Sequence, residues 1–154
     1  MALVKTIALH ITPKDILCFF GGTIGSWITY LYGGWNEGMS TLVTLMAFDY
    51  ITGLLVAGFF KKSAKTAGGG LSSKVGYKGL VKKFVMLIIV AAMYRVDRLL
   101  ALDYLMNLAI IGFVLNELIS LTENAGLMGI PLPAAVIKSI EILKQKANGG
   151  NENV

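Results

Sequence analysis

The sequence has few charged residues, one cysteine and one histidine. Asp, Glu, Lys and Arg make up 15% of its 154 residues, whereas soluble domains average about a quarter. Cys18 alone can form neither an intrachain disulfide nor a metal cluster, and its apolar surroundings favour a small buried hydrophobe. His10 alone supports no His-based metal site and no catalytic triad. We therefore expect a protein that is not an enzyme and that binds no metal or cofactor.

Several sequence signals of soluble or secreted proteins are also missing. The glycine-rich segment 68–79 lacks the G-x-x-x-x-G-K-[ST] spacing of a phosphate loop, and no expected strand precedes it. The net charge is +5, but no nucleic-acid motif is recognisable, so we expect no such partner. Residues 2–12 are too mixed in polarity for the core of a secretory signal, and the first apolar run is expected to remain as an anchor.

Hydrophobic residues, in contrast, make up 55% of the chain, with a mean hydropathy of +0.69. A helix that crosses a bilayer needs roughly 20 mainly apolar residues, with about 17 as the lower limit. The sequence predicts an all-α integral membrane protein with about four transmembrane helices, at residues 15–32, 39–60, 80–96 and 104–121.

The third predicted span is the least apolar. It can cross a bilayer only if Lys82, Lys83 and Arg95 extend outward to the headgroups, and the alternative is an interfacial or re-entrant helix. With four spans and the N-terminus inside, all twelve Lys lie in inside segments, and only Arg95 and Arg98 flank an outside link. Because positive residues favour the cytoplasmic side and anionic lipid, this pattern predicts both termini inside.

The remaining segments flank the predicted transmembrane domain at 15–121 or connect its spans. Residues 1–14 carry apolar residues at helical spacing and are expected to form an amphipathic N-terminal segment. The polar loop 61–79 is rich in Gly and Ser, which predicts flexibility. Residues 122–147 are expected to form a cytoplasmic amphipathic region, helical from 134, on the membrane surface or against a partner, and 148–154 a disordered tail.

Acidic and amide side chains inside two spans are the candidate functional residues. An Asp near the centre of a span, such as Asp49, costs about 2.5–3.5 kcal/mol on insertion scales and must be protonated, paired or exposed to water. A structural hydrogen bond between helices is the simpler alternative. The end of the fourth span carries a polar stripe that would bind other helices or line water. The candidate pore or gating residues are Asp49, Asn116, Glu117, Ser120, Glu123 and Asn124.

Two further patterns concern helix contacts and surfaces. Small residues recur at helical spacing in the first two spans and favour close helix packing or oligomers, as Gly21 with Gly25 and as Gly53 with Ala57. Four charged residues lie around the predicted outside link between the third and fourth spans. They are expected to form an exposed ion-pair cluster, namely Arg95, Asp97, Arg98 and Asp103.

The ordered set of these residues resembles the phage holin family of the toxin-secretion and phage-lysis type, over about residues 40–145. The matching residues are Asp49 to Gly53, Ala57, Lys61, Lys62, Ser72, Ser73, Gly76, Gly79, Leu80, Lys82, Lys83, Asp97, Asn116, Glu117, Ser120, Glu123, Asn124, Gly129, Pro131 and Pro133. The extra glycines up to Gly70 depart from the single tight loop of the family.

The resemblance implies a non-enzymatic protein of the bacterial inner membrane that oligomerises and opens lesions, through which an endolysin or a toxin leaves the cell. Asp49, Glu117 and Glu123 would then contribute to a switch between lipid and water. Moving one charge across the membrane is worth about 2.3 kcal/mol per 100 mV. The residues alone leave two alternatives open, a gated small-solute channel or transporter and a membrane scaffold that transports nothing.

Overall fold

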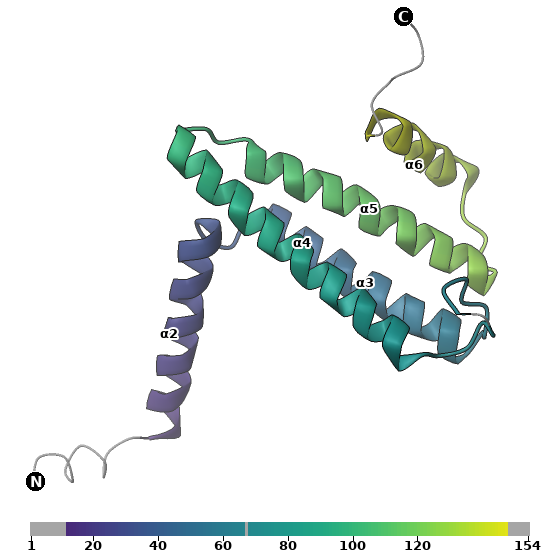
Figure 1. Ribbon diagram of the computed structural model, residues 1–154, viewed down its shortest axis with the longest axis horizontal. Helices are drawn as coiled ribbons and strands as arrows, with labels where there is room; N and C mark the ends of the chain where they lie inside the picture. The colour runs from purple at the N-terminus through teal and green to yellow at the C-terminus, as the bar shows by residue number, and fades with distance from the viewer. Residues whose placement is uncertain (1–11, 67, 148–154) are drawn as a thin grey trace, which may run out of the picture. The chain divides into compact units, whose positions relative to one another are not determined.

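The computed structural model describes residues 12–66 and 68–147, except for the side chains of Lys144, Lys146 and Ala147. Over these residues the chain is all-helical, as predicted, and has no strand (Figure 1). Two compact units are separated after Trp35. The helices are α2 (Pro13–Tyr32), α3 (Glu37–Gly58), α4 (Ser73–Leu100), α5 (Leu105–Met128) and α6 (Ala134–Ala147). Most of the predicted N-terminal segment (residues 1–11) and the predicted tail (148–154) lie outside the described residues.

The first unit contains α2, whose start is set by a capping box. The backbone N–H of Asp15 donates to the Thr12 hydroxyl at 3.4 Å, and that of Thr12 donates to the Asp15 carboxylate at 2.8 Å. No residue of α2 is buried. No heavy atom lies within 4 Å of a Cβ built on Gly21 or Gly25. Their predicted part in helix packing therefore stays a prediction about contacts with other copies.

The second unit contains the three long helices α3, α4 and α5, and α5 contacts both of the others (Figure 1). The core is a narrow seam of residues that recur every three, four or seven positions. It includes Leu42 and Val56 from α3, Val90 from α4 and Ile110 from α5. Large apolar side chains on the outer faces are exposed. Such a surface suits lipid better than water.

Among the described residues, two helices are long and apolar enough to cross a membrane, α3 and α5. The structure does not support the predicted number of four spans. α4 falls short because it carries seven charged residues, namely Lys74, Lys78, Lys82, Lys83, Arg95, Asp97 and Arg98. α2 contains Thr23, Ser26 and Thr29, whose hydroxyls donate to carbonyls of α2 itself.

Two boundaries differ from the sequence prediction. α4 begins at Ser73, so the last seven residues of the predicted flexible loop 61–79 are helical; the lysines there are good helix formers. α5 continues to Met128 and ends at Gly129, where φ is 79°. Glu123 and Asn124 therefore lie inside α5, beyond the predicted end of the fourth span. α6 coincides with the helix expected at 134–147 and contacts α5.

The predicted exposed ion-pair cluster is wrong for Asp97, which is 4% exposed. Its carboxylate accepts hydrogen bonds from the backbone N–H groups of Leu105, at 3.1 Å, and Met106, at 2.8 Å. These groups open α5 and have no partner within that helix. Asp97 therefore joins the end of α4 to the start of α5 and fixes the connection between them.

Candidate functional site: a buried charge cluster

Three charged side chains, one from each long helix, meet inside the second unit. The Lys83 ammonium on α4 donates to the Asp49 carboxylate on α3 at 2.8 Å and also to the Glu117 carboxylate on α5. The side chains of Lys83 and Asp49 are each 12% exposed and that of Glu117 is 2% exposed. We call these three residues the triad. The sequence predicted that Asp49 would be protonated, paired or exposed to water, and in the structure it is paired with Lys83.

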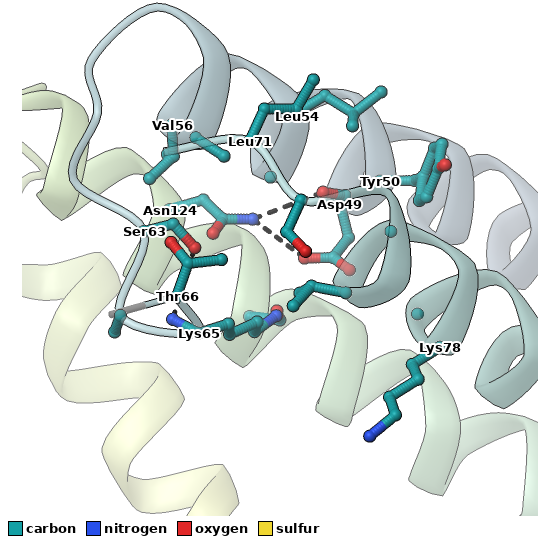
Figure 2. Close-up of a pocket in the computed structure, with 18 of the residues that line it drawn as sticks. Asp49, Tyr50, Leu54, Val56, Ser63, Lys65, Thr66, Leu71, Lys78 and Asn124 are labelled. Atoms are coloured by element: carbon teal, nitrogen blue, oxygen red, sulfur yellow. Dashed lines mark hydrogen bonds between the residues drawn. The ribbon is translucent and has the colours of Figure 1, made fainter. Parts of the chain in front are cut away.

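Asn124 on α5 is a second hydrogen-bond partner of the Asp49 carboxylate. Its Nδ2 donates to Asp49 Oδ1 at 2.9 Å and to Thr52 Oγ1 at 3.0 Å, and Figure 2 shows Asn124 directed at Asp49. Both carboxylate oxygens of Asp49 are therefore engaged. No buried side-chain nitrogen or oxygen of the described residues lacks a hydrogen-bond partner. The cluster is a complete polar network rather than one stray charge.

The triad lies near the middle of its helices. Each of its three residues is roughly 15 Å from the nearer end of its helix, at 1.5 Å per residue, which is about half the thickness of a bilayer core. Two carboxylates share one ammonium, so the triad has an excess of one negative charge. Lys65, from the loop before α4, adds an attractive Coulomb interaction with Asp49. Removing a partner from such a buried group is costly because it leaves a charge unpaired.

A seven-residue spacing places each triad member on the inner face of its helix. On α4, Lys83, Val90 and Asp97 share one buried face. On α5, the buried residues Ile110, Glu117 and Asn124 repeat in the same way. Residues seven apart lie almost above one another on a helix.

Lys83 is the site residue that sequence reasoning missed. The sequence prediction had it extend outward with Lys82, and this is wrong because it turns inward between two acids. The signal that could have found it is its spacing from Val90 and Asp97, which Lys82 does not share.

An adjoining cavity of about 400 Å³ leads to the triad from the α3–α4 loop. It lies between α3, α4, α5 and that loop, and Asp49 and Lys83 form part of its lining (Figure 2). Ser120 and Glu123 also line it, with Glu123 exposed. The polar stripe of α5 is thus divided between a buried network and a cavity wall.

The remaining predicted residues separate by location. Asn116 is exposed and lines a different, open groove between α4 and α5, together with Met86 and Met93. It is not part of the triad network. On α3, a Cβ added at Gly53 would lie 3.8 Å from Asn124 Nδ2, and Ala57 is buried. Gly53 therefore faces Asn124 of α5, and the part of both small residues in helix packing stays a prediction.

The sequence profile of the bacteriophage holin family matches residues 26–145. The chain belongs to this family. The matched part of this holin-family chain includes the triad, Asn124 and Asp97. An uncharacterized protein of Listeria innocua is 37% identical over 94% of each chain. An uncharacterized protein of Halalkalibacterium halodurans is 34% identical over 85% of this chain and 96% of its own.

A protein named as a probable holin, from Bacillus phage phi105, is 25% identical over 75% of this chain and 79% of its own. No solved structure matches the chain. Family membership shows a membrane protein of the holin type, and the triad is where its described helices hold charge away from water.

Proposed function

We propose that this chain is a holin that accumulates and oligomerises in the bacterial inner membrane and then opens lesions. An endolysin, or in some hosts a toxin, leaves through them. The observation that carries the proposal is a complete charge network buried at the middle of three helices in a member of the holin family. Such a network is tolerated in lipid only while the helices enclose it.

In the closed state, α3, α4 and α5 cross the membrane as one unit. The low hydropathy of α4 does not oppose this, because Lys83 is paired with two acids and the segment after it is apolar up to Tyr94. Of its other charges, Lys82 is exposed beside Lys83 and extends its ammonium toward the headgroups, and the rest lie toward the two ends of the helix. α2 crosses as well, because its fully exposed apolar surface suits lipid. The one-sided distribution of lysines then supports both termini inside, with anionic lipid beside them.

In the open state, the same polar face lines water between copies. Separating the helices breaks the bonds of Lys83, and water then replaces them as partner of all three charged groups. Hydration relieves the excess negative charge that the closed triad holds in a low-dielectric setting. A change in membrane potential acts on this charge too, at about 2.3 kcal/mol per charge per 100 mV. The triad would thus couple opening to hydration and voltage.

Inducible expression in bacteria tests the function. We expect growth to continue for a fixed delay, followed by abrupt loss of membrane potential, and by lysis only when an endolysin without its own secretion signal is co-expressed. Endolysin expressed alone is the control. Permeability to ions without release of endolysin would contradict the holin proposal in favour of a small-solute channel. Unchanged potential at every expression level would contradict it in favour of a scaffold.

A further inference from the structure

The cavity beside the triad has a chemistry that the charge network does not use. Its wall includes three further lysines, Lys65, Lys78 and Lys82, and the hydroxyl groups of Ser63, Thr66 and Ser72. The three lysines are exposed, so their ammonium groups can reorient. Figure 2 shows Lys65 beside Thr66 at the loop, whereas Lys78 extends outward from the rim. The mouth of the cavity is therefore basic and rich in hydroxyl groups.

Two carboxylates line the same cavity, and neither cancels this basic character. Both oxygens of Asp49 already accept hydrogen bonds, from Lys83 and from Asn124. Glu123 offers a single negative charge at an exposed position against three lysines. An anion at the mouth would consequently meet more positive than negative groups.

The loop that forms one wall is held in shape by its own hydrogen bonds. The Ser63 N–H donates to Gly69 O at 3.0 Å, and the Thr66 hydroxyl donates to Gly70 O at 2.9 Å. Gly69 has a φ of +68°, and a Cβ there would lie 2.1 Å from Lys61 O. Only glycine fits at this position. The hydroxyl of Ser72, the residue before α4, makes no capping bond and stays available to a ligand.

Apolar side chains continue from the cavity to the outer surface. Leu54 and Leu71 line the cavity and are 39% and 63% exposed. A free inorganic anion would make no favourable contact with this apolar wall, whereas an acyl chain would pack against it. Basic pockets between membrane helices on the cytoplasmic side are suited to anionic headgroups.

We propose that this cavity binds the phosphodiester headgroup of an anionic phospholipid, with its acyl chains along Leu54 and Leu71. Lys65 and Lys82 supply charge, and the hydroxyl of Ser72 supplies a hydrogen bond. The site rests on the proposed function only in requiring that the loop lie at the membrane surface. The bound headgroup holds the loop across the entrance to the triad, so the lipid stabilises the closed state.

Binding can be measured on the full chain in a neutral detergent by native mass spectrometry. Phosphatidylglycerol is the probe, phosphatidylcholine the neutral lipid for comparison, and inorganic phosphate the competitor. We expect retained phosphatidylglycerol, little phosphatidylcholine, and no displacement by millimolar phosphate. With each lysine near an anionic headgroup contributing roughly fivefold, Lys65→Gln with Lys82→Gln should weaken phosphatidylglycerol binding by about 25-fold.

The matched control is Lys61→Gln with Lys62→Gln, which removes the same amount of charge from the start of the α3–α4 loop, at residues that do not line the cavity. It should change binding less than twofold. Equal losses in the two double variants would overturn the site in favour of diffuse attraction, and displacement by phosphate would overturn the lipid as ligand. Should the first double variant lose helical circular dichroism, Lys65→Gln alone, in the exposed loop, gives the same test at about fivefold. Because this assay needs no cells, its failure is separate from a failure to lyse.

Discussion

Replacing Lys83 by Gln is expected to lower the free energy of unfolding by about 3–5 kcal/mol, as for the removal of one partner from other buried ion pairs. The substitution leaves Asp49 and Glu117 facing each other without the cation that both bond to. Glu117 is 2% exposed, so little water can take the place of the cation while the helices stay packed. The closed state therefore loses stability, and lysis should begin earlier than in the wild type.

SDS-driven unfolding in mixed micelles measures this loss. The control is Lys74→Gln, which removes a lysine from the exposed start of the same helix and should change stability by less than about 0.5 kcal/mol. The triple variant Asp49→Asn, Lys83→Gln, Glu117→Gln keeps the shape without charge and should recover most of the loss, since uncharged replacements of buried ion networks are often tolerated. A triple variant as unstable as Lys83→Gln alone would show that the pairing of charge is not what matters.

Neutralising one acid of the triad should have the opposite effect on timing. Asp49→Asn keeps one acceptor oxygen, which can still accept from Lys83 but cannot also replace the second oxygen that accepts from Asn124, and Glu117→Gln can still accept from Lys83. Each leaves one ammonium with one carboxylate, so the excess negative charge disappears. The closed state then gains stability relative to the hydrated open state, and we expect a longer delay before lysis, or none within the growth of the culture.

Culture turbidity and membrane potential after induction at matched protein levels measure this delay. Glu37→Gln, an exposed acid on the same helix as Asp49, is the control and should lyse on the wild-type schedule. Unchanged timing for both Asp49→Asn and Glu117→Gln would remove the triad from the mechanism. A shift in the same direction as that of Lys83→Gln would show that these acids act only through general stability.

The sequence was sufficient for much of the fold, because apolar runs and caps are local signals. It correctly predicted a helical protein and a compensated Asp49, and it put Glu117 and Asn124 among the functional candidates. It failed at α4, where the adjacent residues Lys82 and Lys83 have the same hydropathy but different environments. Lys82 is exposed, whereas Lys83 is paired with two acids inside the unit. Lys83 differs from Lys82 in sharing a helix face with Val90 and Asp97. That face can be recognised as buried only when α3 and α5 are known to cover it.

Asp97 was misjudged for a similar reason. A charged residue near a chain reversal resembles a solvated ion pair by composition, and its true partners are backbone N–H groups of the next helix. Backbone partners have no signature in residue type. The location of the cavity likewise depends on the path of the α3–α4 loop, which composition described only as flexible.

The central claim is that the inner face of the long helices turns from protein to water when the lesion opens. Cys18 is the only cysteine, so a Cys18→Ser background carrying Ala91→Cys, at a buried position on α4, can be labelled in cells with a membrane-impermeant thiol reagent. Ala92→Cys, exposed on the same helix, is the matched control for the lipid-facing side. We predict that Ala91→Cys is unlabelled before lysis and labelled once membrane potential collapses, while Ala92→Cys stays unlabelled. An Ala91→Cys variant that lyses on time and remains unlabelled throughout would contradict the account.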